Sequence, residues 1–244
     1  MKTLLITQAR IGSSRLPMKV LKEVNGKTFL EIHLERIKKA KEIDKIIVAT
    51  TFEDGVEEII SIANKLNIRT FQGSTDDVLD RYYQAAKNEN PDFVVRVTSD
   101  CPLIDPSIID QLVKVIKGGQ YDYAANNFIP TFPHGFEVEV MTFKALEQAW
   151  HNARDRDHRE HVTPYIRINS DYFNKNFFKA YSLENMTNYS YFRITLDYEE
   201  DLNLLKKIIE LWGYNLSGEN ICLNLEKNPQ LLNINKLWNE RLQM

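Results

Sequence analysis

The sequence predicts an α/β fold built on a mostly parallel, doubly wound sheet. Short apolar runs such as Leu4–Thr7 and Phe93–Val97 alternate with segments of helical period such as Phe29–Lys41, whose apolar residues fall on one face. A parallel strand that is buried on both faces has a continuous apolar run, and a crossover helix has one apolar face. The alternation recurs up to Gly118. We therefore expect helices on both faces of the sheet and a ligand crevice beyond the carboxyl ends of its strands.

The first half of the chain contains this alternation. We expect strands at Leu4–Thr7, Ile46–Ala49, Arg69–Phe71 and Phe93–Val97, and helices at Phe29–Lys41, Thr51–Leu66, Val78–Ala86 and Pro106–Lys117. Asp77 and Asp105 precede two of the helices, where a side-chain oxygen accepts hydrogen bonds from the free amides of the first turn. His33 lies beside the apolar face of the first helix. We interpret it as a packing residue and not as a ligand.

The second half of the chain has a different texture. Tyr121–Ala125 has an extended pattern, Phe136–Val140 alternates like a half-exposed strand, and Phe177–Tyr181 and Phe192–Leu196 are further strand candidates. Helices are expected at Phe143–Trp150, Glu199–Trp212 and Ser217–Leu242, the last two forming a helical C-terminal part. The length of 244 residues suits one domain, 1–244. A subdomain or arm is expected at about 120–170.

Composition excludes several classes of protein. The chain has 43% hydrophobic and 27% charged residues and a formal net charge of -3, so broad nucleic-acid binding, which needs a basic surface, is not expected. No apolar run approaches the roughly 18 residues of a membrane span, and the N-terminal apolar run is too short for a signal peptide. A cytoplasmic location is the expectation. Cys101 and Cys222 are expected to be reduced thiols.

The stretch Gln8–Lys19 is the first candidate site. It reads Q-A-R-I-G-S-S-R-L-P-M-K and brings Arg10, Arg15 and Lys19 to the end of the first strand, with small residues at 12–14. Cationic side chains and loop amides of this kind suit a polyphosphate. The stretch lacks the Gly-Lys-Ser/Thr ending of a Walker loop and the spaced glycines of a dinucleotide fold. The alternative is a solvated loop whose cations pair with surface acids.

Two aspartates at other strand ends extend this candidate site. Asp100 follows the strand Phe93–Val97, and Asp197 follows the strand candidate Phe192–Leu196. Both are expected to point into the crevice beyond the loop, where carboxylates are ligands for a hard cation such as Mg²⁺. Asp105 is better explained as a helix cap. The acidic residues at 199–201 have an alternative role in complementing the positive end of a helix.

These segments together resemble the cytidylyltransferase family. The segments that carry the resemblance, which covers essentially the whole chain, are the loop Gln8–Lys19, Asp100–Leu103, Arg159–Tyr165 and Leu196–Leu202. The likeness is greatest to the spore coat polysaccharide type, and the CMP-Kdo and CMP-sialate synthetases are similar at a greater distance. Met18 departs from the pattern, because glycine is frequent at that position of the family's loop.

The resemblance implies a fold, a reaction and a set of residues. The fold is a single-domain, Rossmann-like nucleotide-diphospho-sugar transferase fold, and the reaction is Mg²⁺-dependent transfer of CMP from CTP to an acidic sugar or related acceptor, with release of pyrophosphate. Catalysis is implied for Arg10, Arg15, Lys19 and Asp100, and metal binding for Asp100 and Asp197. Nucleotide contacts are implied for Ala9, Arg10, Ser13, Arg15 and Lys19, and more weakly for Gly73, Ser74, Asp77 and Arg81.

The acceptor site and the partners follow less directly from the resemblance. Glu137, Glu139, Arg159 and His161 are candidates for binding the acceptor or activating its hydroxyl, and the alternative for them is a polar strand face and a salt-linked helix. A homodimer is expected through the arm at 120–170. Two other functions remain open: a glycosyltransferase that uses a finished nucleotide sugar, and a non-catalytic nucleotide-binding protein.

Overall fold

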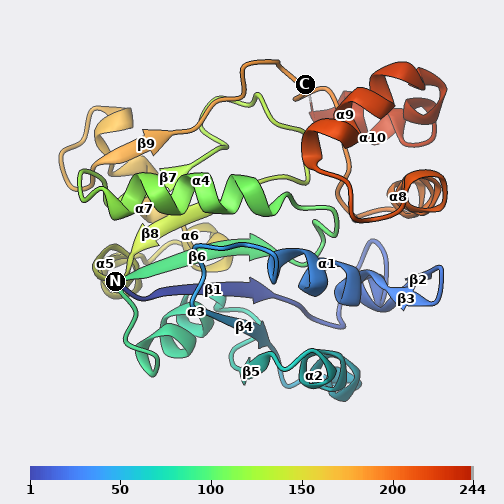
Figure 1. Cartoon of the computed structure of the whole chain (residues 1–244). Coiled ribbons are helices and arrows are strands. Elements are labelled where there is room, and N and C mark those ends of the chain that lie inside the picture. Colours follow the sequence, from blue (N-terminus) through green and yellow to red (C-terminus); the bar gives the residue numbers. More distant parts are fainter. Residues whose placement is uncertain (243–244) are drawn as a thin grey trace.

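A seven-stranded mixed sheet forms the centre of the computed structural model, which describes residues 1–242 (Figure 1). Its strand order is β5-β4-β1-β6-β8-β7-β9. The strands are β1 (Thr3–Gln8), β4 (Lys45–Thr50), β5 (Arg69–Gln72), β6 (Phe93–Thr98), β7 (Tyr123–Ala125), β8 (Glu139–Thr142) and β9 (Ala180–Ser182). Of these, β8 runs antiparallel to its neighbours β6 and β7, and the other pairings are parallel. The expected mostly parallel α/β fold is confirmed.

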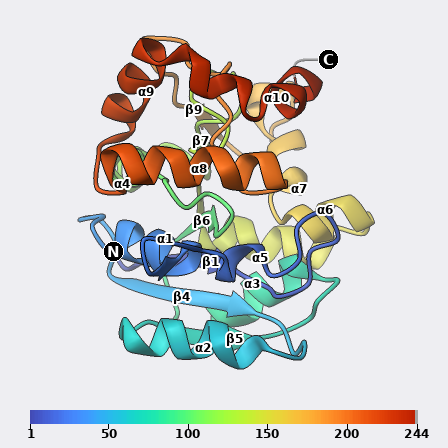
Figure 2. The same cartoon turned by 90° about the vertical axis from the view of Figure 1, so that its right-hand side faces the viewer.

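Helices cover both faces of the sheet, as expected from the alternating pattern (Figures 1 and 2). The first face carries α1 (Phe29–Ile37), α2 (Val56–Lys65) and α4 (Pro106–Lys117), and the second carries α3 (Val78–Lys87), α5 (Phe143–Asn152) and α7 (Pro164–Ile168). Side chains alternate along β1, so that Leu5 packs in the first core while Leu4 and Ile6 pack in the second. Both faces of the sheet are therefore buried.

The C-terminal helices gather at one end of the molecule (Figure 2). They are α8 (Glu199–Trp212), α9 (Gly218–Lys227), the 3-10 helix Pro229–Asn233 and α10 (Lys236–Leu242). The expectation of one helix over Ser217–Leu242 is wrong. The helix breaks at Asn228, which precedes Pro229 and has non-helical angles (φ -130°, ψ 56°), because a proline ring excludes helical geometry at the residue before it. Among residues 1–242 no helix is long and apolar enough to cross a membrane.

The strand expected at Phe192–Leu196 is also wrong. The segment crosses His134 in an isolated parallel bridge, with hydrogen bonds from His134 N to Phe192 O (2.9 Å) and from Ile194 N to His134 O (2.8 Å). Gly135 allows the two backbones to approach this closely, because a Cβ at this position would come within 2.8 Å of the backbone of Ile194. Beyond this bridge Leu196 N donates to Asp100 O at 2.7 Å, which brings the start of the Asp197 loop to the end of β6.

A small hairpin, β2 (Glu23–Val24) and β3 (Lys27–Thr28), was not expected. Its turn is Asn25-Gly26, and both residues have positive φ (51° and 73°). Asn-Gly between short strands is a strong hairpin signal, so this element was readable in the sequence. The 3-10 turns Lys19–Leu21 and Asp171–Phe173 and the short helix α6 (Arg156–His161) complete the secondary structure of the described residues.

Candidate functional site

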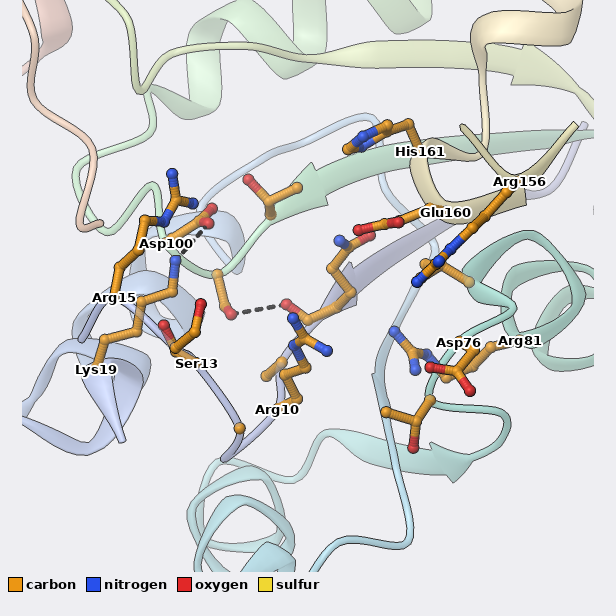
Figure 3. A pocket seen from close by; sticks show the side chains of 18 residues that line it. Arg10, Ser13, Arg15, Lys19, Asp76, Arg81, Asp100, Arg156, Glu160 and His161 are labelled. Atoms are coloured by element: carbon orange, nitrogen blue, oxygen red, sulfur yellow. Dashed lines mark hydrogen bonds and ion pairs between the residues drawn. The ribbon is translucent and has the colours of Figure 1, made fainter. Parts of the chain in front are cut away.

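A polar pocket of about 340 Å³ opens at the carboxyl ends of β1 and β6 (Figure 3). Its walls come from the loop after β1, the loop before α3, the end of β6 and helix α6. The lining residues are Gln8, Ala9, Arg10, Gly12, Ser13, Ser14, Arg15, Lys19, Thr75, Asp76, Val78, Arg81, Thr98, Ser99, Asp100, Arg156, Glu160 and His161. The pocket lies where the ligand crevice of a doubly wound sheet is expected.

The loop after β1 is held close to the chain that follows β4. Gly12 N donates to Glu53 Oε2 at 3.4 Å, and Thr51 Oγ1 donates to the same oxygen at 2.7 Å. A Cβ on Gly12 would meet the Glu53 carboxylate, so a larger residue here would displace the Glu53 side chain from this contact. Ser13 Oγ accepts a hydrogen bond from Leu16 N at 3.4 Å, which closes a turn within the loop.

Met18 has a left-handed backbone conformation, with φ 55° and ψ 28°. It precedes the 3-10 turn Lys19–Leu21, and its N–H donates to Ile11 O at 3.3 Å. Left-handed geometry costs a residue with a Cβ about 1–2 kcal/mol and costs glycine almost nothing. The glycine that is frequent at this position in the family's loop thus has a physical reason, and Met18 adopts the same turn under strain.

The turn at Met18 places the Lys19 ammonium between two carboxylates. Lys19 Nζ donates to Asp100 Oδ2 and to Asp197 Oδ1, each at 2.8 Å. Burial lowers the pKa of Lys19, but the two carboxylates outweigh this effect and raise it. Burial likewise raises the pKa of Asp100, but Lys19 and hydrogen bonds lower it to about 2. Lys19 and Asp100 are therefore both charged at neutral pH.

Two arginines add positive charge on the same side of the pocket. Arg15 Nη2 lies 3.1 Å from Asp197 Oδ1, and its guanidinium carbon lies 5.1 Å from the centre of the Tyr198 ring. Figure 3 shows Arg10 pointing into the pocket beside Lys19 and Ser13. Two of the three expected loop cations, Lys19 and Arg15, thus form ion pairs with Asp100 or Asp197, and all three line the pocket.

The Asp197 carboxylate is oriented from behind by Arg193. Arg193 Nη2 donates to Asp197 Oδ2 at 3.2 Å and to Asp201 Oδ2 at 2.8 Å, and its Nε donates to Asp201 Oδ1 at 2.9 Å. Asp201 is fully buried and also accepts from the backbone N–H groups of Asp197 and Tyr198, at 3.1 Å each. Asp201 therefore has a larger part than complementing a helix end, because it fixes the Asp197 loop.

The opposite wall is formed by Arg81 and helix α6. Arg81 is almost fully buried, and its Nη1 donates to Ser74 O at 2.6 Å. Burial lowers the pKa of this guanidinium. Figure 3 shows Asp76 beside Arg81, with Arg156, Glu160 and His161 of α6 above them. This wall contains both charges and suits the polar edges of a ribose or base better than a polyphosphate.

Helix α6 ends abruptly at Val162. This residue has φ 70° and ψ -56°, and Thr163 N donates to His161 O at 2.8 Å, which closes a γ-turn. The turn is strained for a β-branched residue. The Val162 side chain is fully buried in the second core, so packing pins the turn and holds His161 at the rim of the pocket.

The structure places only part of the expected site residues at the pocket. Those that line it are Ala9, Arg10, Ser13, Arg15, Lys19, Arg81, Asp100 and His161. Asp197 reaches it through the ion pairs with Lys19 and Arg15. Gly73, Ser74, Asp77, Glu137, Glu139 and Arg159 lie outside the lining.

Glu139 is a structural residue. It is 3% exposed, forms an ion pair with Arg96, and accepts hydrogen bonds from the hydroxyls of Tyr123 and Thr163. A buried carboxylate with both oxygens bonded is not available to an acceptor, so the expected acceptor contact is corrected. The alternating pattern of 136–140 did not reveal the burial, because Glu139 lies within β8, between β6 and β7.

The residues at 73–77 and Arg159 also have structural explanations. Asp77 caps α3 by accepting from Asp80 N at 2.9 Å, and its other oxygen lies 2.6 Å from Arg159 Nε. Arg159 Nη1 further donates to the carbonyls of Trp150 and Ala153. A Cβ on Gly73 would come within 2.9 Å of Arg81. These bonds give the residues a supporting role, in which they hold Arg81 and α6, and their direct contact to nucleotide or acceptor stays a prediction.

Glu137 lies near Asp100 and outside the lining of the pocket. Glu137 Oε1 is 2.6 Å from His134 Nδ1, and Oε2 accepts from Gly135 N at 2.8 Å. The Cys101 sulfur lies between Glu137 and Asp100, 3.9 Å and 3.8 Å from their oxygens. Burial lowers the pKa of His134, but Glu137 outweighs it and raises the pKa. Glu137 and His134 thus form a polar surface next to Asp100, which remains a candidate for acceptor contact.

The residues present fit a divalent cation whose coordination is completed by oxygen atoms of the substrate. Among residues 1–242 no group of three or more His, Cys, Asp or Glu side chains forms a ready-made metal site. Asp100 and Asp197 nevertheless place one oxygen each around the same Lys19 nitrogen. Mg²⁺ is commonly held by one or two carboxylates together with waters and substrate phosphates. The two aspartates are the side chains that would hold it.

Several residues of the site were missed in the sequence. Arg156 and Glu160 are four residues apart and so share a face of α6, which helical spacing indicates, and both line the pocket. Arg193 and Asn235, which both bond Asp201, had no readable signal because the tertiary fold alone brings them together. Gln8, at the end of β1, lines the pocket with a buried Oε1 that has no hydrogen-bond partner.

Comparison with known proteins decides the family. A sequence model described as Cytidylyltransferase matches residues 4–230, which include the loop cations, Asp100 and Asp197. The chain belongs to the cytidylyltransferase family. It is therefore a nucleotidyltransferase, and the resemblance inferred from its sequence segments is confirmed.

Two relatives match this cytidylyltransferase over nearly its whole length. It is 42% identical to an uncharacterized protein of Methanocaldococcus jannaschii, over 96% of this chain and 95% of the relative. It is 29% identical to the spore coat polysaccharide biosynthesis protein SpsF of Bacillus subtilis, over 93% of this chain and 95% of the relative. Among solved structures, it is similar to a cytidylyltransferase from Leptospira borgpetersenii, at 35% identity and TM-score 0.88 (95% and 96% covered). A CMP-Kdo synthetase complexed with CTP shares the fold at 13% identity and TM-score 0.65 (86% and 99% covered).

Proposed function

We propose that the protein transfers CMP from CTP to an acidic sugar or a phosphorylated, sugar-like acceptor in surface polysaccharide biosynthesis, with release of pyrophosphate. One observation carries the proposal: Lys19 lies 2.8 Å from both Asp100 and Asp197, at the mouth of a pocket that Arg10 and Arg15 also line. Cations from one loop and carboxylates from two other segments converge on the same point. That arrangement suits a triphosphate bound together with Mg²⁺.

The loop residues have separate roles in this reaction. Arg10, Arg15, Lys19 and the amides around Ser13 bind the β- and γ-phosphates and stabilise the charge that develops on the leaving pyrophosphate. Asp100 and Asp197 would hold Mg²⁺, which would supply Lewis-acid stabilisation of charge on the phosphates. Catalysis then consists of positioning an acceptor oxygen in line for attack on the α-phosphorus. The new bond joins that oxygen to the α-phosphorus, the bond from the α-phosphorus to the pyrophosphate oxygen breaks, and no protein nucleophile is required.

The nucleoside is assigned to the wall opposite the loop cations. Arg81, Asp76 and Gln8 offer hydrogen-bonding groups there, and the Gln8 side-chain oxygen is buried without a partner. The acceptor is assigned to the surface formed by Glu137 and His134 beside Asp100, with His161 at the rim. The names of the relatives support a sugar-like acceptor, since SpsF is a polysaccharide biosynthesis protein and other relatives are 3-deoxy-manno-octulosonate cytidylyltransferases.

A pyrophosphate-release assay tests the proposal. Purified protein with CTP and Mg²⁺ is offered a panel of acidic sugars, phosphorylated sugars and phosphorylated polyols. We expect acceptor-dependent pyrophosphate release and formation of a CMP conjugate with at least one member of the panel. CTP binding without release for any acceptor would favour a non-catalytic nucleotide-binding protein. Sugar transfer from a finished nucleotide sugar, without pyrophosphate release, would favour a glycosyltransferase.

We also propose that residues 1–244 act as one cytidylyltransferase domain that pairs through the arm at about 120–170. Large apolar side chains are exposed along and just beyond this excursion: Ile129 (41%), Ile168 (43%), Tyr172 (40%), Phe173 (42%) and Phe177 (71%). These five residues are called the arm patch. Clustered exposed apolar side chains mark association surfaces. The occupant that we propose is the arm patch of a second copy, because homodimers commonly pair the same surface of both subunits about a two-fold axis.

A further inference from the structure

Asn235, near the C-terminus, reaches back to the loop that carries Asp197. It is 2% exposed, and its side-chain nitrogen donates to Asp201 Oδ1 at 2.9 Å and to the carbonyl oxygen of Arg193 at 3.0 Å. Asp201 in turn accepts from the Asp197 backbone. One amide therefore joins the chain after the 3-10 helix 229–233 to both residues that orient the Asp197 carboxylate.

Trp238, in α10, makes a second link to the same loop. Its ring stacks on Tyr198, with ring centroids 3.4 Å apart and planes 5° apart, and its indole N–H donates to Glu200 Oε2 at 2.9 Å. Tyr198 also lies under the guanidinium of Arg15, 5.1 Å from its centre. The indole therefore supports the aromatic ring against which a triphosphate-binding arginine rests.

We propose that Asn235 and Trp238 are positioning residues of the nucleotide–metal site, which hold Asp197 and Arg15 in the geometry that binds Mg²⁺ and CTP. The inference rests on the proposed function. The family match ends at residue 230, so the segment that carries both residues lies outside the part of the chain that identifies the family.

The chemistry of the contacts argues for more than packing. Both Asp201 oxygens are occupied in the fully buried position, one by Arg193 and Asn235, the other by Arg193 and two backbone N–H groups. Loss of the Asn235 donor leaves the buried Asp201 carboxylate short of one hydrogen bond. The carboxylate would then shift, and the residues that also bond to it, Arg193 and the Asp197 backbone, would shift with it. Outer contacts that orient metal ligands commonly change metal affinity or activity about tenfold to a hundredfold when removed.

The test uses four single variants of the full chain: Asn235→Ala, Trp238→Ala, the conservative Trp238→Phe, and Leu237→Ala as the matched control. Leu237 lies between the two positions and is 55% exposed. Mn²⁺ binding in the presence of CTP, without any acceptor, is measured by electron paramagnetic resonance. The kcat, the KM for CTP and the Mg²⁺ concentration for half-maximal rate are measured where an acceptor is known. Thermal unfolding reports stability.

We expect Asn235→Ala and Trp238→Ala to weaken Mn²⁺ binding with CTP about tenfold or more, and to raise the Mg²⁺ requirement in step. Trp238→Phe keeps the stacked ring and is expected to retain most of the affinity, and Leu237→Ala to match the wild type. If the alanine variants unfold at lower temperature but bind Mn²⁺ and CTP as the wild type does, the two residues are merely structural and the proposal is overturned.

If Trp238→Ala does not fold, a fifth variant, Trp238→Leu, replaces it. Trp238→Phe and Trp238→Leu both keep an apolar side chain, but only phenylalanine keeps the stacked ring. Equal Mn²⁺ affinity in these two variants would overturn the role of Trp238. Failure of the proposed function has a different signature, since the wild type itself would then bind no Mn²⁺ with CTP. Normal binding by the wild type and by both alanine variants would leave the proposed function standing and remove only the positioning role.

Discussion

The Lys19 ammonium donates to the Asp100 carboxylate at 2.8 Å, and this ion pair joins the loop after β1 to the end of β6. Asp197 is bonded to the same nitrogen. Lys19 therefore lies between the two carboxylates, in the position that a divalent cation held by both of them would share. Phosphate oxygens that attract Lys19 would release the carboxylates, so CTP binding and metal binding should be coupled.

Replacing Lys19 by Met tests this coupling. We expect kcat to fall about a hundredfold to a thousandfold, because a group that stabilises charge on the leaving pyrophosphate is lost. Without CTP, however, the variant should bind Mn²⁺ more tightly than the wild type, because no ammonium competes for Asp100 and Asp197. Lys22→Met, in the same segment but outside the pocket, is the control. Unchanged Mn²⁺ binding by Lys19→Met without CTP would contradict the competition.

Asp100→Asn separates catalysis from folding. Asparagine has the same shape but lacks the charge, so the fold should persist while Mg²⁺-dependent turnover falls at least about a hundredfold, as a metal site worth several kcal/mol is weakened. Circular dichroism checks the fold, and the rate is measured over a series of Mg²⁺ concentrations. Asp54→Asn, an exposed carboxylate outside the pocket, controls for net charge. Activity of Asp100→Asn equal to that of the wild type would remove Asp100 from the mechanism.

Most of the scaffold was predictable because local patterns and tertiary structure agree there. The parallel strands β1, β4 and β6 have largely apolar runs. Helices α4 and α8 have the predicted bounds because a cap or an acidic first turn marks their starts. The segment Phe192–Leu196 failed for a physical reason. Its apolar side chains are buried, but its backbone bonds go to His134 and Asp100 and not to a strand ladder, which an apolar run cannot reveal.

The candidate site was predictable where a charge follows a buried strand. Lys19 and Asp100 follow the parallel strands β1 and β6, whose carboxyl ends lie at one edge of the sheet. Asp197 follows a segment that is not a strand, and the hydrogen bond from Leu196 N to Asp100 O brings it to the same place. The burial of Glu139 and the ion pair of Arg159 could not be foreseen, because a charged residue in an alternating or helical stretch looks the same whether it faces a ligand or a protein partner. Arg96 and Asp77 are those partners, and pairing over such separations depends on the tertiary fold.

His33 predicts a pH dependence of stability. Its ring is fully buried between Thr7 Oγ1 (2.9 Å) and Cys101 O (3.0 Å), and burial lowers its pKa to about 4 from an ordinary 6.5. Between these values the unfolded chain binds a proton that the folded chain does not. Stability contributed by this residue is therefore complete above about pH 6.5 and is lost as the pH falls, by about 1.4 kcal/mol per pH unit.

Urea unfolding at pH 7, 6 and 5 measures this slope. His33→Gln should remove it, so that the free-energy difference between wild type and variant shrinks as the pH falls. His151→Asn, which removes an exposed histidine, should keep the slope of the wild type. Parallel stability curves for wild type and His33→Gln would show that the buried imidazole does not titrate as described.

The arm patch predicts a dimer that one charge disrupts. Phe177, 71% exposed, is replaced by Asp, and we expect a shift from dimer to monomer in sedimentation velocity at micromolar concentration, because a buried unpaired carboxylate opposes association. Met186→Asp introduces the same charge at a fully exposed position outside the arm patch and should leave the dimer intact. A wild type that sediments as a monomer would contradict the proposed pairing.

Met18→Gly should stabilise the protein. The left-handed backbone at φ 55° costs methionine about 1–2 kcal/mol, which glycine would not pay. The greater conformational freedom of glycine in the unfolded chain offsets about 0.5–1 kcal/mol of this stabilisation. Met18 is 44% exposed, so little apolar burial is lost, and a net stabilisation of up to about 1 kcal/mol is expected from urea unfolding. Met18→Ala keeps the Cβ and thus the strain. If alanine stabilises the protein as much as glycine does, the effect comes from the side chain and not from the backbone turn that presents Lys19.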